Sequence, residues 1–445
     1  MAKIKFRLSP PRLIALGFLV VILAGAGLLC LPFASKGEAV SFSDALFTAT
    51  SATCVTGLVV RDTFTTWTGF GQGLILLLIQ LGGLGLMTVI TLCSYALGKH
   101  LGLYSRKVLM QSAGNMSLSG VGSLIRRIIP FSFVLEGAGA LLLSIRFIPE
   151  FGWGKGIWYA VFHAISAFCN AGFDLMGAKQ PFSSMTDYVH DPLVSITLCV
   201  LIVVGGLGFL VWRDLRQNGL HWNKYQLHTK LVLTVNLLLL LGGAVLFLIF
   251  EWDAAMEGMS FGQKLLASVF QSVTTRTAGF NTVDLSRLSE SGTLLTNVLM
   301  MIGGSPGSTA GGIKTTTVAV LFLSTLASAR GKYRVNAFRY SIDRDTIRQA
   351  CSIVVIYLSL AFVSIMLLCA TDGVSGKAAS VEVCSAVATV GLTLGITPGL
   401  TLAGKLLLIL LMYAGRIGGL SFVLLFGEKK SEPPVDRPNG KLLIG

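Results

Sequence analysis

DALFTATSATCVTGL, residues 44–58, stands between two long apolar segments and mixes apolar residues with Thr and Ser. A helix of this length rises only about 20 Å, whereas the hydrocarbon core of a bilayer is about 30 Å thick. We therefore expect the segment to enter the membrane and return to the side it left. Non-helical backbone survives at that depth only where protein or water surrounds it, because lipid offers no partner to its N–H and C=O groups.

The same design recurs in three further stretches: YAVFHAISAFCNAGF (159–173), LASVFQSVTTRTAGF (266–280) and SVEVCSAVATVGLTL (380–394). Each of the four stretches places a glycine after a small or β-branched pair, at Gly57, Gly172, Gly279 and Gly391, with separations of 115, 107 and 112 residues. Each also lies between two apolar spans. This periodicity predicts an all-α integral membrane protein built from four span–half-helix–span repeats in a pseudo-fourfold arrangement around one pore.

Composition places the whole chain in a membrane. The 445 residues are 53% hydrophobic and only 13% charged, against roughly 25% charged in a soluble domain. Eight spans are predicted, at 12–33, 72–97, 127–148, 192–212, 229–250, 294–329 (interrupted), 347–369 and 403–426. The first is interpreted as an uncleaved membrane helix, because it is long and lacks a convincing small-residue cleavage site. The predicted repeats are 1–97, 98–218, 219–340 and 341–427, followed by a tail, 428–445.

The net charge of +14 does not indicate a nucleic-acid-binding protein, because most of the basic residues lie on one side of the predicted membrane. Five segments that lie on one side of the predicted membrane hold 23 Lys and Arg residues: 1–12, 98–128, 213–230, 330–350 and 427–445. The opposite side holds 9, against 14 Asp and Glu. This bias predicts that both termini are cytoplasmic. The basic segments are expected to face anionic lipid or an acidic cytoplasmic partner.

The glycines suit a ring of main-chain oxygens. A ring of backbone carbonyls can replace the water shell of an alkali cation, and glycine permits the positive φ and close approach that such loops need. We call 55–57, 170–172, 277–279 and 389–391 the four glycine loops. Their residues are the predicted potassium-binding backbone: Val55, Thr56, Gly57, Asn170, Ala171, Gly172, Thr277, Ala278, Gly279, Thr389, Val390 and Gly391. The alternative is that the small residues only let short helices pack.

On these loops the chain resembles the Trk/Ktr/HKT superfamily of potassium transporters, and most of all the membrane subunit of bacterial Ktr systems. The resemblance covers almost the whole length. It implies potassium uptake across a bacterial plasma membrane through a multi-pass protein that is not an enzyme and needs no covalent cofactor. Glycine in all four loops is what the family associates with potassium passage, and Gly57 stands where sodium-selective members tend to carry serine. A requirement for sodium is left open.

"GGSPGSTAGG", residues 303–312, divides the span 294–329. One helix of 36 residues would run about 54 Å, far beyond the hydrocarbon core, so a break is expected below the third glycine loop. The resemblance implies that this intramembrane loop is a gate. The candidate gate residues are Gly303, Gly304, Ser305, Pro306, Gly307, Ser308, Thr309, Ala310, Gly311, Gly312, Lys314 and Arg416.

Enzymatic interpretations of the same residues are weak. "GSTAGGIKT" (307–315) departs from a phosphate-binding P-loop, because Ile313 separates the last glycine from Lys314 and no strand precedes it. Ser305 lacks the G-x-S-x-G turn of a serine hydrolase, since Pro306 follows it. The five histidines show no metal-binding spacing, and the eight cysteines form no CxxC pair, so buried free thiols are expected.

Three ionisable residues fall at membrane depth and are functional candidates: Glu136, Lys314 and Arg416. The position of Arg416 matches the family's arginine beneath the filter, which implies an electrostatic barrier that contacts the intramembrane loop. Alternatively, Arg416 pairs with a carboxylate such as Glu136. Lys314 either belongs to the gate or extends its amine toward the cytoplasm.

Further charged residues are predicted to lie near the glycine loops. Arg276 precedes Gly279 by three residues and is expected to point away from the pore and to pack behind the third loop. Six acids are predicted at the outer mouth, where they either concentrate cations or form an ordinary solvated surface: Glu38, Asp44, Asp62, Asp174, Asp284 and Glu382.

No segment of the chain resembles a nucleotide-binding domain, so control is expected from elsewhere. The resemblance implies a cytosolic ring of RCK-type nucleotide-binding regulatory subunits on the basic loops, and a homodimer in the membrane with one pore per protomer. The tail is expected to pack on protein. The alternative function is a sodium-coupled secondary transporter with alternating access, in which broken helices also mark midplane sites.

Overall fold

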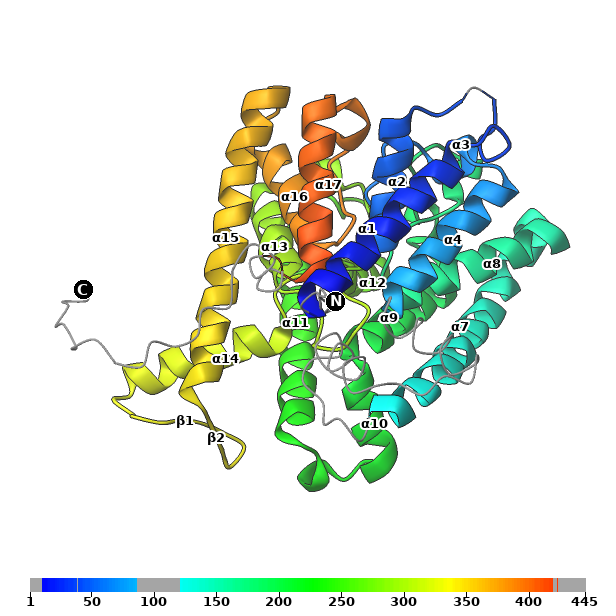
Figure 1. Cartoon of the computed structure of the whole chain (residues 1–445). Coiled ribbons are helices and arrows are strands. Elements are labelled where there is room, and N and C mark those ends of the chain that lie inside the picture. The colour runs from blue at the N-terminus through cyan, green and yellow to red at the C-terminus, as the bar shows by residue number, and fades with distance from the viewer. Residues whose placement is uncertain (1–9, 38, 86–120, 419–421, 423–445) are drawn as a thin grey trace, which may run out of the picture.

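The computed structural model describes residues 10–37, 39–85, 121–418 and 422. Residues 98–120 of the basic segment 98–128, the tail and Glu38 therefore lie outside the described residues. In the described part nearly all regular elements are helices. Many of these helices lie side by side and run in roughly the same direction (Figure 1).

Four described helices are long and apolar enough to cross a membrane: α1 (Pro10–Leu29), α7 (Val121–Phe151), α11 (Leu227–Phe250) and α15 (Arg344–Asp372). No more than 39% of the apolar window of any of them is buried inside the protein. Their exposed side chains are large and apolar, for example Leu141, Leu238 and Phe362. Such surfaces suit lipid rather than water, so the chain is a multi-pass membrane protein.

A short helix follows each of these long ones: α2 (Phe42–Cys54), α8 (Trp153–Phe168), α12 (Phe261–Thr274) and α16 (Gly376–Ala388). Serine begins three of them. The side chains of Ser41 and Ser375 each accept a backbone N–H of the first turn, and Ser260 forms a capping box with Gln263. Each short helix ends within five residues of the glycine of its loop. With 13 to 16 residues, they are too short to cross a bilayer.

A further helix follows each loop: α4 (Gly69–Gly83), α9 (Pro192–Leu207), α13 (Glu290–Met301) and α17 (Leu402–Ile417). The predicted division of span 294–329 is present, because α13 ends at Met301 and α14 (Thr315–Ala329) begins 14 residues later. Figure 1 shows α14 running crosswise to α15.

The predicted span 192–212 is bent rather than straight. The chain bends by 93° between α9 and α10 (Phe209–Asn218). Gly208 makes the bend at φ +92°, a conformation that residues with a side chain rarely adopt.

The remaining elements are small. Within the described residues they comprise α3 (Thr63–Thr66), five 3₁₀ turns and one hairpin, with the turns at Met176–Ala178, Thr186–Tyr188, Trp222–Lys224, Leu285–Arg287 and Thr397–Gly399. The hairpin joins β1 (Val335–Ala337) to β2 (Tyr340–Ile342) in antiparallel register, with Ala337 opposite Tyr340. Its two turn residues, Phe338 and Arg339, both have positive φ, as a tight two-residue turn requires.

Glycines let the helices after the loops approach the loops closely. A Cβ built on Gly82, Gly205 or Gly415 would come within 3.0 Å of the carbonyl oxygen of Thr53, Phe168 or Val387, respectively. Each of these carbonyls lies four residues before the glycine of its loop. Helices α4, α9 and α17 therefore press against the base of three glycine loops in the same way.

Gly205→Ala tests this packing. The added methyl would overlap the carbonyl oxygen of Phe168, and overpacking of this kind costs about 1–3 kcal/mol. Alanine otherwise stabilises a helix interior by roughly 1 kcal/mol relative to glycine. A destabilised variant would therefore show that the clash outweighs this helix preference. We expect the midpoint of thermal unfolding in detergent to fall by about 2 °C or more.

Gly206→Ala is the matched control, because its Cβ would meet only the side chain of Asn170, at 3.7 Å. We expect this variant to unfold at the wild-type temperature or above. Equal midpoints for the two variants would contradict the packing argument.

Candidate functional site

The four glycine loops contact one another in cyclic order. A Cβ built on each glycine would lie no more than 2.7 Å from a carbonyl oxygen of the next loop: Gly57 faces Ala171, Gly172 faces Ala278, Gly279 faces Val390, and Gly391 faces Thr56. Loops that are more than 100 residues apart in sequence therefore meet edge to edge and close on themselves. Any side chain at these positions would push into a neighbouring loop.

The loop backbones share an alternating conformation. All four glycines have positive φ, between +69° and +99°. The residue two places before each glycine is also left-handed: Val55 (+57°), Asn170 (+59°), Thr277 (+71°) and Thr389 (+54°). The residue between the two is not left-handed, so left-handed residues alternate with others along each loop. For residues with a side chain this conformation costs roughly 1–2 kcal/mol, so the surrounding protein must impose it.

Hydroxyl groups in the last turns of the short helices hold the loops. The Ser51 hydroxyl accepts the N–H of Gly57 at 3.1 Å, and the Ser385 hydroxyl accepts that of Gly391 at 2.9 Å. In the second loop the Ser166 hydroxyl donates to the carbonyl of Phe173 at 2.7 Å. The equivalent donor in the third loop is Thr274, which bonds the carbonyl of Phe280. These hydroxyls were not predicted from the sequence, although serine lies six residues before the glycine in three of the loops.

The intramembrane loop lies against the second and fourth glycine loops. The Thr309 hydroxyl donates to the carbonyl of Phe168 (3.3 Å) and to the side-chain oxygen of Asn170 (3.2 Å). A Cβ on Gly311 would overlap the Thr389 hydroxyl. Residues Gly303 to Ser305 and Thr309 to Gly312 are buried, whereas Pro306, Gly307 and Ser308 are half-buried. The loop is thus packed into the protein rather than extended into solvent.

The bend at Gly208 supports the other side of this loop. The N–H of Phe209 donates to the carbonyl of Gly307 at 2.9 Å, and the N–H of Ser305 donates to the carbonyl of Gly206 at 3.0 Å. From α11, the side-chain amide of Asn236 donates to the Ser305 hydroxyl at 3.1 Å. This support was not predicted from the sequence. A signal was present, because GGLG occurs both at 205–208 and at 82–85.

Arg416 links the intramembrane loop to the end of α4. Its guanidinium donates to the carbonyl of Thr309 and to the carbonyl of Gly82. The alternative pairing of Arg416 with Glu136 is wrong. Glu136 is buried and instead accepts two hydrogen bonds from the side-chain amide of Gln80, at 3.0 and 3.2 Å.

Lys314 also belongs to the intramembrane loop. Its amine donates to the carbonyl of Ala310 at 2.7 Å and lies 3.4 Å from the carbonyl of Gly311. The amine is thus bonded within the loop itself. Arg276 is buried and lines a small cavity together with Asn236 and Gly304.

The solvated interpretation of the outer acids is wrong for three of the five that are described. Asp44 is buried between Arg61 (3.0 Å) and Lys405 (2.8 Å). Asp62 is buried and accepts the N–H groups of Thr65 and Phe182. Glu382 is buried completely. These carboxyl groups hold parts of the protein together. Asp284 is exposed and Asp174 half-buried.

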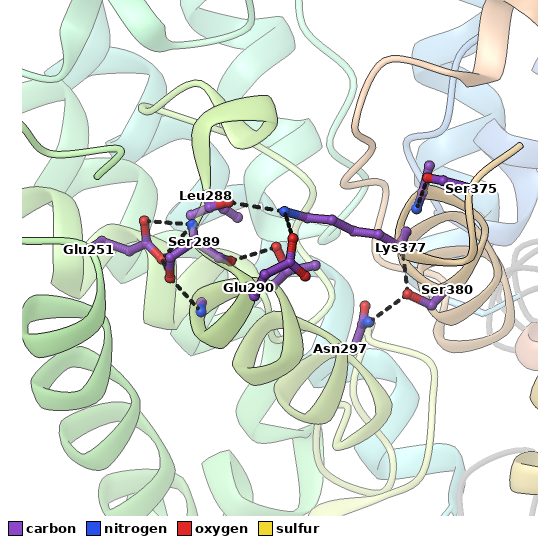
Figure 2. Close-up of polar contacts among 11 residues, drawn as sticks. Glu251, Leu288, Ser289, Glu290, Asn297, Ser375, Lys377 and Ser380 are labelled. Carbon is purple, nitrogen blue, oxygen red and sulfur yellow. Dashed lines mark hydrogen bonds and ion pairs between the residues drawn. The ribbon is translucent and has the colours of Figure 1, made fainter. Parts of the chain in front are cut away.

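Polar contacts on α13 position α16, the short helix of the fourth loop (Figure 2). Asn297 donates to the Ser380 hydroxyl at 2.9 Å, and Lys377 donates to the carbonyl of Leu288 at 3.2 Å. At the start of α13, Ser289 donates both its N–H and its hydroxyl to the fully buried carboxylate of Glu251. The third and fourth predicted repeats are thereby joined.

Comparison with known proteins identifies the family. Residues 16–433 match the model of TrkH, a cation transport protein. The chain is 44% identical to the potassium/sodium uptake protein NtpJ of Enterococcus hirae, over 100% of this chain and 99% of that protein. It is 41% identical to the Ktr system potassium uptake protein B of Bacillus subtilis, over 99% of this chain and 97% of that protein. The chain therefore belongs to the TrkH family of cation transport proteins, and the predicted resemblance is confirmed.

The fold agrees with this assignment. The potassium transporter TrkH of Vibrio parahaemolyticus superposes with a TM-score of 0.74 at 20% identity, covering 96% of this chain and 87% of that one. The Ktr system potassium uptake protein B of Vibrio alginolyticus is 40% identical, over 98% of this chain and 95% of that protein. These relatives are transporters rather than enzymes.

Proposed function

We propose that the four glycine loops form a selectivity filter through which the chain takes up potassium. The observation that carries the proposal is the closed ring of loops, in which each glycine faces a carbonyl of the next loop. Main-chain oxygens in such a ring can replace the hydration shell of a potassium ion. The short helices run toward the ring with their C-terminal ends, where the helix dipole adds about half a negative charge. The names of the relatives agree with potassium as cargo.

The intramembrane loop would act as the gate. It lies against the second and fourth glycine loops, and Arg416 holds it to α4. A guanidinium at this depth would oppose the passage of a cation while it stays bonded to these carbonyls. Lys314 would stiffen the loop from within.

Control and assembly follow from the same proposal. The relatives named as Ktr proteins belong to a system, which supports an additional component. We propose that this component is a cytosolic ring of RCK-type nucleotide-binding subunits, that the chain forms a membrane homodimer, and that both termini are cytoplasmic. The basic hairpin and its neighbours (330–350) would face the ring.

Alternating access is the second candidate. The helix breaks at Gly208 and over 302–314 are of the kind that marks midplane sites in secondary transporters. This function does not explain why four loops share one backbone conformation and close on one another. We therefore favour the filter.

Gly57→Ser tests the filter. The new side chain would be strained at φ +95° and would press on the carbonyl of Ala171, 2.5 Å from its Cβ. We expect the preference for potassium over sodium in proteoliposome uptake to fall by about tenfold, equivalent to 1.4 kcal/mol. Gly37→Ser is the matched control, because Gly37 has φ +87° with no atom within 4 Å of an added Cβ. Unchanged selectivity in Gly57→Ser would count against the filter.

Arg416→Ala tests the gate. Loss of the guanidinium removes both the barrier and the bonds to Thr309 and Gly82, so we expect rubidium uptake by the chain alone to rise severalfold. Arg416→Lys keeps the charge but not the forked geometry and should give an intermediate rate. If Arg416→Ala lowers uptake and the unfolding temperature together, Arg416 is structural and the gate proposal is wrong.

A further inference from the structure

Glu382 is a fully buried carboxyl group beside the fourth glycine loop. It lies on α16, nine residues before Gly391. Its Oε1 accepts hydrogen bonds from the hydroxyls of Thr393 and of Thr397, the latter at 2.9 Å. The two threonine oxygens are 3.1 Å apart, and the Thr393 hydroxyl also accepts the N–H of Gly395 at 2.9 Å. One carboxyl oxygen thus bonds two threonines of the segment that follows the loop.

This segment lies at the outer end of the ring. Thr393 comes two residues after Gly391, where burial changes from complete to partial. One turn further along α16, the Ser385 hydroxyl holds the N–H of Gly391 itself. The fourth loop is therefore fixed to α16 at two successive points, by Ser385 at the glycine and by Glu382 just beyond it.

The second loop uses the same register. His163 lies nine residues before Gly172. Its Nδ1 contacts the carbonyl of Tyr159 at 2.7 Å, and its Nε2 accepts the N–H of Leu175 at 3.2 Å. In the first and third loops this register holds Thr48 and Phe270. The two loops with such a clamp are not neighbours in the cyclic order.

The two clamps differ in one respect. Both ring nitrogens of His163 have partners, whereas Oε2 of Glu382 has none within the described part of the chain. A buried polar atom without a partner is costly. The clamp of the fourth loop therefore bears a cost that the clamp of the second loop avoids.

We propose that Glu382 is a positioning residue for the transported cation. Through Thr393 and Thr397 it sets the outer edge of the fourth loop, and with it the fit of the outermost cation position. The inference rests on the proposed filter and goes beyond it, because it assigns part of the ion preference to a side chain that does not line the ring.

The test compares Glu382→Ala, Glu382→Gln and Thr397→Val in proteoliposomes, with potassium and sodium uptake measured over a range of concentrations. For Glu382→Ala we expect the KM for potassium to rise and the potassium-to-sodium preference to fall, each about threefold to tenfold. Glu382→Gln keeps an acceptor oxygen for the threonines and should recover most of the preference. Thr397→Val removes one of the two donors and should shift the preference in the same direction as Glu382→Ala.

The double variant Glu382→Ala/Thr397→Val should be no worse than Glu382→Ala alone, because the two residues act through one contact. Glu257→Ala, at an exposed acid, is the control and should leave KM and preference unchanged. If the Glu382 variants and Thr397→Val change only the maximal rate, in proportion to the amount of folded protein, the inference is overturned. If Glu382→Ala does not fold, the KM and the ion preference of Glu382→Gln and Thr397→Val decide whether the inference holds.

Failure of the inference can be told apart from failure of the proposed function. When Gly57→Ser alters the preference and the Glu382 and Thr397 variants do not, the filter stands and the role of Glu382 is refuted. When Gly57→Ser also leaves the preference unchanged, the filter itself fails, and the inference fails with it.

Discussion

Backbone that leaves a helix inside a membrane must find its partners within the protein, because lipid offers none. Four loops of this chain face that requirement at once: their N–H groups donate to carbonyls and hydroxyls of their own short helices, and the loops close on one another. Glycine is needed where they touch, since any Cβ would enter a neighbouring carbonyl. The left-handed residues two places earlier, such as Val55 and Thr389, are held by this mutual contact and by hydroxyls of the short helices.

The parts below the ring are not equivalent. Gly82, Gly205 and Gly415 all press against the carbonyl four residues before a loop glycine. The residue that follows is glycine in the first two segments and Arg416 in the last. One position of a repeated packing pattern thus carries a charge, and the interrupted third segment supplies Thr309 as its acceptor. The candidate gate therefore lies where the chain departs from the repeated pattern, at Arg416 and Thr309.

Carboxyl groups on the side predicted to face outward serve mainly to hold loops. Asp44 joins Arg61 and Lys405, and Glu251 receives the start of α13. Buried acids with several hydrogen bonds fix the ends of short elements at little conformational cost, which suits loops that must keep one shape. Glu382 fits this pattern and holds the segment directly after a glycine of the ring, which is why it is the acid that we connect with ion preference.

The sequence by itself determined the membrane class, the four glycines and the break at 303–312, because apolar length and glycine punctuation are local properties of the chain. The sequence also indicated the family, since each loop motif is a contiguous stretch of residues. Only the tertiary structure decided the bend at Gly208, the acceptors of Arg416 and the burial of Glu382. Each of these depends on carbonyls, hydroxyls or helices that folding brings together from distant parts of the chain, and a residue's neighbours in sequence do not reveal which of them will lie within hydrogen-bonding distance.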